Sequence, residues 1–221
     1  MDTPVRRHRL ILLTACLLSA LALSRVACAS GASTAADLNI LRQAENLDLN
    51  GSSLAARKMY DIYERKHPDD TPTVPSAINL YALNRLDQVW GYFTQIQKNG
   101  TNSDREYASL WLALLYTKDK GKLPAGKERQ QLLPDIFITP ARREIARLYR
   151  EELSLQKFTD FINTTSAFAQ RDELTEIIFF TAGYIKYVMK DPAQAEKLIA
   201  NNKSKLFAGS LERPLMEIGL P

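Results

Sequence analysis

Cysteine and histidine are both scarce in this sequence, and their scarcity limits its chemistry. The 221 residues contain 2 cysteines and 2 histidines, and both cysteines, Cys16 and Cys28, fall within the first 29 residues. Without that segment the chain has no thiol nucleophile and no pair of cysteines for a disulfide. Its one remaining histidine, His67, cannot supply the three or four converging ligands of a metal site. We therefore expect no metal, no cofactor and no catalytic residues.

The first 29 residues have the three-part layout of a secretory signal peptide. Three arginines lie in residues 6–9, an uncharged and mostly apolar stretch follows over residues 10–23, and residues 27–29 offer the small-x-small pattern of a cleavage site. A membrane span needs about 20 apolar residues, and Arg25 interrupts this stretch too early. We expect cleavage after residue 29, which leaves an exported chain without cysteine. Such a chain fits the bacterial periplasm better than a eukaryotic extracellular space, so we expect export to the periplasm.

Lipid attachment is the alternative fate of this segment. Leu13-Thr14-Ala15-Cys16 resembles the lipobox of bacterial lipoproteins, although the apolar run before Cys16 is short. Cys28 follows Arg25-Val26-Ala27, and an arginine is a poor lipobox residue. Cys16 and Cys28 therefore stay candidate lipidation sites. The protein would then be lipid-anchored to an envelope membrane, and it would meet a membrane only through this lipid or the signal segment.

The positive charge of the chain belongs mostly to this leader. The whole sequence has 29 Lys and Arg against 25 Asp and Glu, a formal net charge of +4. The leader holds four arginines and one aspartate, so the remainder has 25 basic and 24 acidic residues. A nearly neutral chain lacks the electrostatic footprint of a nucleic-acid-binding protein, so we expect no nucleic acid partner.

Beyond the leader, the apolar residues follow helical spacing almost throughout, and no stretch alternates as a strand would. Residues 30–36 are small and polar and predict a flexible start. Residues 37–221 predict a single all-α domain. Glycine and proline are frequent over residues 118–138, which predicts an irregular loop there.

The first half of this domain contains two similar helix pairs spaced 33 residues apart. Four residues of the first pair correspond to four of the second: Ala44 to Ala77, Gly51 to Asn84, Ala56 to Val89, and Tyr60 to Phe93. The pattern resembles the tetratricopeptide repeat, a helix–turn–helix unit of about 34 residues. Gly183, Ala195 and Ile199 keep some of the same offsets later in the chain. The resemblance covers about half of the chain beyond the leader and implies a right-handed stack of helix hairpins, an α-solenoid with a concave groove.

The repeat register predicts which side chains would face that groove. They are Glu45, Tyr81, Tyr184 and Tyr187. Aromatic side chains in a groove commonly anchor peptide partners. A tyrosine inside a helix is as often a core residue whose hydroxyl reaches the surface, so both interpretations stay open here.

A cluster of arginines offers a second candidate surface. It consists of Arg142, Arg143, Arg147 and Arg150. Glu144, Glu151 and Glu152 interleave with it. The cluster could dock an acidic protein partner, or it could form a solvated, salt-bridged helix face.

Two motifs that suggest enzyme chemistry fail on their context. Residues 121–127 satisfy GxxxxGK, but Glu128 follows where a phosphate-binding loop carries the Ser or Thr that holds magnesium. Glu173 and Glu176 share a helix face, but no apolar pocket is evident that would raise the pKa of either carboxyl. We therefore expect that the protein is not an enzyme.

The most consistent function is that of a non-catalytic periplasmic scaffold or adaptor that binds a protein partner. The repeat resemblance implies service in an envelope assembly such as secretion, pilus or outer-membrane machinery. The alternative is a periplasmic immunity or inhibitor protein that blocks one toxin or enzyme, which would present acidic residues to a basic active site. The oligomeric state, the organism and the partner's identity stay open.

Overall fold

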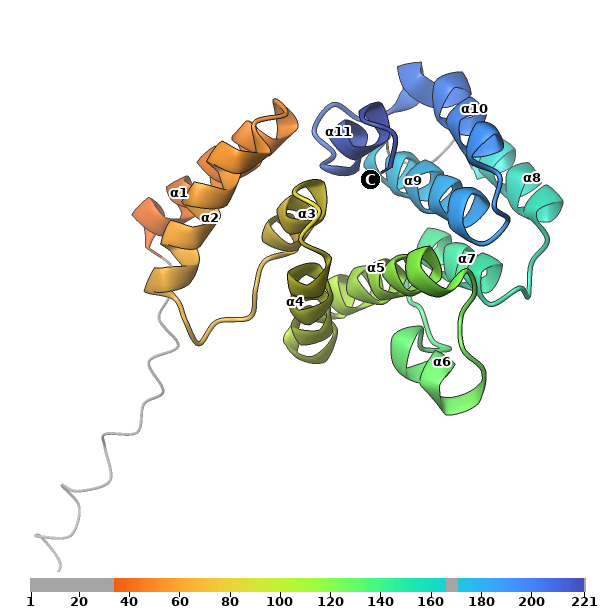
Figure 1. The fold of residues 1–221 in the computed structure, drawn as a ribbon, viewed down its shortest axis with the longest axis horizontal. Helices are drawn as coiled ribbons and strands as arrows, with labels where there is room; N and C mark the ends of the chain where they lie inside the picture. The colour runs from red at the N-terminus through yellow and green to blue at the C-terminus, as the bar shows by residue number, and fades with distance from the viewer. Residues whose placement is uncertain (1–33, 166–170, 221) are drawn as a thin grey trace, which may run out of the picture. The chain divides into compact units, whose positions relative to one another are not determined.

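The computed structural model describes residues 34–165 and 171–220, and all of their regular structure is helical (Figure 1). The all-α prediction is confirmed for these residues. The predicted signal peptide and the candidate lipidation sites Cys16 and Cys28 lie outside the described residues. The helices belong to one compact unit, Ala35–Pro221. They are α1 (Ala35–Leu49), α2 (Ser53–Lys66), α3 (Val74–Ala82), α4 (Leu86–Asn99), α5 (Asn102–Lys120), α6 (Gly126–Leu132), α7 (Pro140–Tyr149), α8 (Leu155–Thr165), α9 (Arg171–Tyr187), α10 (Pro192–Asn202), the 3₁₀ turn η1 (Lys203–Lys205) and α11 (Glu212–Glu217).

The turns of the first two hairpins share one backbone conformation. Gly51 follows α1 with a φ of 74°, and Asn84 follows α3 with a φ of 56°. In both turns the next amide donates to a carbonyl five residues earlier: Ser52 to Leu47 at 2.8 Å, and Arg85 to Leu80 at 2.9 Å. Glycine and asparagine are the residues that best tolerate this left-handed position after a helix. The alignment of Gly51 with Asn84 thus corresponds to the same turn.

The other aligned positions share a packing role. Six of them have no exposed surface: Ala44, Ala56, Tyr60, Ala77, Val89 and Phe93. The alanines allow the paired helices to approach closely, and the aromatic ring fills the space beside them. α1 and α2 contact each other extensively, as do α3 and α4.

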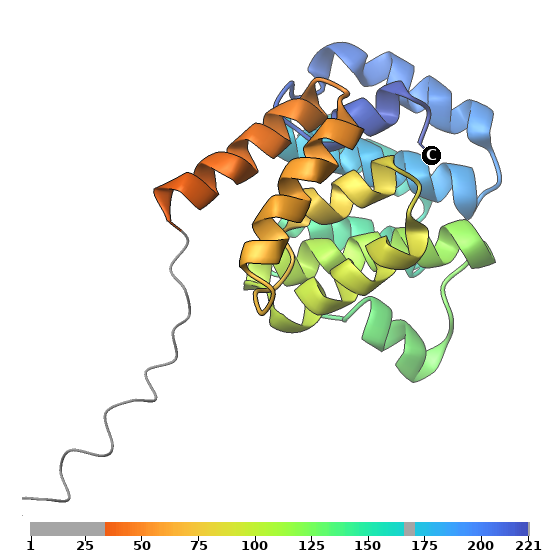
Figure 2. The ribbon, with the colours of Figure 1, turned by 60° about the vertical axis from the view of Figure 1, so that its left-hand side comes forward.

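Trp111 on α5 lies at the centre of the main core. Its ring stacks on Phe93 from α4 with centroids 5.0 Å apart, and it contacts Phe179 from α9 at the same distance. Tyr81 from α3 meets it edge-on at 4.9 Å. α5 therefore connects the α3–α4 hairpin to α9, which pairs with α10; α9 and α10 lie side by side in both ribbon views (Figures 1 and 2).

Gly183 allows α9 to pack closely on α5 and α7. A Cβ at this position would overlap the Leu114 side chain and would lie 3.2 Å from the Tyr149 hydroxyl. Close packing between the helices therefore requires glycine at this position, whose backbone does not have a positive φ.

The segment predicted as a loop over residues 118–138 is partly helical, so that prediction is wrong in part. α5 continues to Lys120 and ends at Gly121, whose φ is 82°. α6 then occupies Gly126–Leu132 and buries none of its residues. Its Lys, Glu, Arg and Gln residues are good helix formers. Their helix propensity outweighs the effect of the nearby glycines and prolines on which the loop prediction was based.

The α1–α2 hairpin has its own apolar cluster, formed by Ala44, Ala56 and Tyr60. Several hydrogen bonds join it to the next hairpin. Arg57, 3% exposed, donates to Glu64 on its own helix at 2.7 Å and to the Ser76 hydroxyl on α3 at 2.9 Å. Hydrogen bonds in such a junction are directional, so they specify how the hairpin docks as well as stabilising it.

Two further hydrogen bonds join α1 and α2 to α3. The Asn79 amide donates to the Asp48 carboxylate and to the Ser53 carbonyl, each at 2.8 Å. Asn79 is fully buried, and burial raises the pKa of the Asp48 carboxyl.

Candidate partner-binding groove

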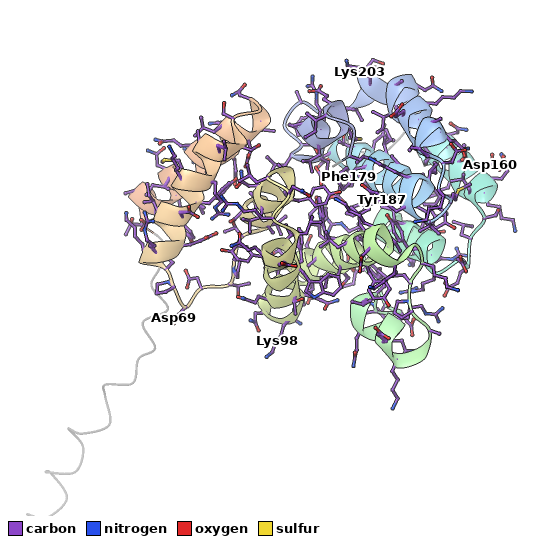
Figure 3. The ribbon with its side chains drawn as sticks, in the orientation of Figure 1. Asp69, Lys98, Asp160, Phe179, Tyr187 and Lys203 are labelled. Carbon is purple, nitrogen blue, oxygen red and sulfur yellow. The ribbon has the colours of Figure 1, made fainter. Side chains whose placement is uncertain are left out.

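The three tyrosines predicted to line an open groove lie in the core, so this prediction is wrong. Tyr81 has no exposed surface, and Tyr184 and Tyr187 are 9% and 8% exposed. Figure 3 labels Tyr187 and Phe179 where α9 faces α5. The Tyr187 hydroxyl donates to the Leu220 carbonyl at 3.1 Å. Tyr184 and Tyr187 are core residues because α9 packs on α5, and Tyr81 on α3 lies against Trp111 of α5.

Glu45, the fourth predicted groove residue, lies on α1 within the separate N-terminal hairpin. It is half-buried, and burial raises the pKa of its carboxyl. The structure therefore does not bring it together with the three tyrosines.

The arginine cluster divides into two residues that bond to neighbouring elements, the half-buried Arg142 and the buried Arg150, and two that do not, Arg143 and Arg147. Arg142 donates to both carboxylate oxygens of Glu176, at 2.9 and 2.7 Å. Arg150 is 8% exposed and donates to the carbonyls of Leu133 and Pro134. Arg143 and Arg147 remain exposed or half-exposed, and both lie beside Glu144. The four residues therefore do not form one patch, because two of them fasten α7 to its neighbours.

A groove of about 600 Å³ opens where the start of α4 lies beside the end of α5. The two helices are antiparallel neighbours joined by a short turn, which brings these ends together. Trp90 is 37% exposed there, and Leu115 beside it is 7% exposed. We call this the α4–α5 groove. It is lined by Leu86, Asp87, Trp90, Leu115, Tyr116, Lys118, Asp119 and Lys120.

Lys118 gives the α4–α5 groove its electrostatic character. Its ammonium lies 5.0 Å above the centre of the Tyr81 ring. Burial, together with the nearby charge of Lys186, lowers the pKa of the Lys118 ammonium. Lys118 forms no ion pair with any residue in the described part of the chain, whereas Lys120 pairs with Asp119 at 2.8 Å.

A second cavity, of about 290 Å³, contains a buried carboxyl group on α11. Glu212 is 5% exposed and accepts hydrogen bonds from the Tyr107 and Ser210 hydroxyls. Burial raises the pKa of Glu212 to about 7. The Arg142–Glu176 pair lines the same cavity. This cavity combines a proton-binding carboxyl with an ion pair.

Sequence reasoning missed Trp90, Lys118 and Glu212 as candidate functional residues. The α4–α5 groove depends on α5 extending to Lys120, within a segment predicted as a loop. The environment of Glu212 depends on a contact with Tyr107, 105 positions earlier, which local periodicity does not encode.

His67 directly follows α2 and caps its C-terminus. Its ring nitrogens lie 3.4 Å from the Asp37 carboxylate and 3.4 Å from the Asp70 carboxylate.

Over residues 34–165 and 171–220, no group of three or more His, Cys, Asp or Glu side chains could hold a metal ion. In the same residues, no helix has the length and apolar character to cross a membrane. Comparisons with protein-family models, with curated proteins and with solved structures give no match. The interpretation of the α4–α5 groove therefore depends on its own geometry.

Proposed function

We propose that this protein is a non-catalytic adaptor that holds a protein partner in the α4–α5 groove. The observation that carries this proposal is the combination of Trp90, 37% exposed on an apolar floor, with a lysine that has no ion-pair partner among the described residues. Tryptophan is among the residues that most often dominate the binding energy of protein interfaces.

The sequence supports the cellular compartment and the type of assembly in this proposal. The signal-peptide pattern of residues 1–29 supports export to the bacterial periplasm, with lipid anchoring at Cys16 or Cys28 as the alternative. The matching turns and buried positions of the first two hairpins support a tetratricopeptide-like, right-handed stack over α1–α4. That resemblance favours a role in an envelope assembly.

An immunity or inhibitor protein is the competing function. Such a protein would insert acidic residues into a basic active site. The α4–α5 groove instead carries Lys118 without a counter-ion, while one of its two aspartates, Asp119, is paired with Lys120. This charge distribution favours the adaptor.

Affinity purification from the envelope fraction of native cells tests the proposal. The tagged protein is compared with Trp90→Ala and with Lys98→Ala, an exposed position at the other end of α4 (Figure 3). We expect several components of one assembly with the wild type and Lys98→Ala, and their loss with Trp90→Ala. Unchanged recovery with a correctly folded Trp90→Ala would exclude the groove. A single stoichiometric toxin or enzyme would favour the inhibitor function.

A further inference from the structure

Lys118 is a half-buried cation without a counter-ion in the described part of the chain. Its one described favourable contact is with the face of the Tyr81 ring, at 5.0 Å. A cation–π contact is favourable but does not neutralise the charge. Partial desolvation of an ammonium is unfavourable, and a carboxylate within a few ångströms would relieve it.

The other charges around the α4–α5 groove do not fill this role. Asp119 is paired with Lys120. Asp87 lies in the first turn of α4, where the positive end of the helix dipole stabilises its charge. Lys186 donates to the carbonyls of Gly219 and Leu220 and adds positive potential beside Lys118. The local field around Lys118 therefore favours an incoming negative charge.

The shape of the groove favours a helix as its occupant. Its walls are the antiparallel helices α4 and α5, and the space between two such helices accepts the side-chain ridge of a third. Leu86 and Trp90 lie four residues apart, on one face of α4. Leu115 on α5 completes the apolar floor. Amphipathic helices commonly bind in grooves of this kind through apolar anchors one turn apart.

We propose that the α4–α5 groove receives an acidic amphipathic helix of a partner protein, with its apolar face on Leu86, Trp90 and Leu115 and a carboxylate paired with Lys118. This inference rests on the proposed adaptor function and adds the chemistry of the partner. The apolar face supplies binding energy, and the carboxylate determines the register and orientation of the bound helix.

Site-specific photo-crosslinking in native cells tests the inference. A photoreactive amino acid replaces Asp87 at the edge of the groove, and in a separate strain it replaces Lys98 at the far end of α4. Crosslinked partner segments are identified by mass spectrometry. We expect a crosslink from position 87, absent from position 98, to one segment with helical apolar spacing and at least one Asp or Glu.

The charge pair is tested in the same assay with Lys118→Glu and the matched control Lys127→Glu, an exposed lysine on α6 outside the groove. We expect Lys118→Glu to reduce the crosslink at least about tenfold, as for loss of a desolvated charge pair. Lys127→Glu should leave it unchanged. Replacing the partner's acidic residue with lysine should restore the crosslink to Lys118→Glu.

The other possible results contradict either the acidic helix, the partner helix or the use of the groove. A crosslink from position 87 that Lys118→Glu leaves intact, or a partner segment without a carboxylate, overturns the acidic helix and leaves the adaptor function standing. A crosslink to a second copy of this chain or to a small molecule overturns the partner helix. Absence of any crosslink from position 87 overturns both the inference and the proposed use of the groove.

Discussion

The hydroxyl of Tyr107 on α5 donates a hydrogen bond to the carboxylate of Glu212 on α11, and the two residues are 105 positions apart. Ser210 donates to the same carboxylate from two residues away. Glu212 therefore holds the short helix α11 to the centre of the main core. Because the carboxyl group is buried, its protonation state affects the stability of this contact.

The stability of the protein should decrease as the pH rises from about 4.5 to 7. Burial raises the pKa of Glu212 from 4.5 to about 7, so the folded state binds a proton more tightly than the unfolded state. The stabilising contribution of the protonated Glu212 carboxyl is therefore complete below pH 4.5 and is lost as the pH rises through the pKa of the folded state, about 7. With 1.36 kcal/mol for each pKa unit, the loss is about 3 kcal/mol.

Glu212→Gln isolates this contribution, because glutamine resembles the protonated carboxyl in size and hydrogen bonding. Urea denaturation at pH 5 and pH 8 should show the variant gaining stability relative to the wild type at the higher pH. The exposed Glu217 on the same helix provides the control, and Glu217→Gln should follow the wild type. Parallel pH profiles for the wild type and Glu212→Gln would contradict the prediction.

Local features of this fold are predictable from the sequence, because neighbouring residues determine them. Pro140 starts α7, as expected for proline in a first helical turn. Gly51 and Asn84 mark turns because few residues tolerate a positive φ. The 33-residue spacing identifies matching buried positions because helix pairs repeat the same small and bulky contacts.

The burial of particular tyrosines is not predictable in this way. Tyr81 and Tyr187 are buried because α9 packs against α5, and helical periodicity identifies an apolar face without naming what covers it. Lys118 belongs to α5 although glycine and proline follow it closely. The α4–α5 groove, whose lining residues come from two helices, therefore emerges only from the tertiary arrangement.

Gly183→Ala should destabilise the protein by about 1–3 kcal/mol, because the added methyl group overlaps Leu114 and forces α9 away from α5. Gly91 on α4 is the matched control: a Cβ there meets no other described atom within 4 Å. Gly91→Ala should stabilise the helix by up to about 1 kcal/mol. Chemical denaturation measures both changes, and equal effects of the two substitutions would exclude close packing as the role of Gly183.

Arg57→Ala should loosen the α1–α2 hairpin before the rest of the protein unfolds. The substitution removes the guanidinium that donates to Glu64 and to the buried Ser76 hydroxyl, while Glu64 still accepts hydrogen bonds from the Ser76 and Tyr92 hydroxyls. The expected cost is about 1–2 kcal/mol after allowance for the partial exposure of Glu64. Hydrogen exchange should show lost protection in α1 and α2 and retained protection in α5 and α9. Lys58→Ala, exposed on the same helix, should have little effect. Uniform loss of protection throughout the chain would show that the hairpin is not a separate unit of stability.

At positions 51 and 84, glycine and asparagine should replace each other with less loss of stability than alanine causes at either position. Both residues have a positive φ after a helix, where a side chain with a Cβ costs about 1–2 kcal/mol and asparagine is the best tolerated exception. Gly51→Ala and Asn84→Ala should therefore each lower the free energy of unfolding by about 1 kcal/mol. Gly51→Asn should cost less than Gly51→Ala, and Asn84→Gly should be neutral or slightly stabilising, because both keep a residue suited to the turn. Thermal denaturation of the four variants measures this order. A larger loss for Asn84→Gly than for Asn84→Ala would show that the asparagine side chain, and not its backbone conformation, determines the residue at this turn.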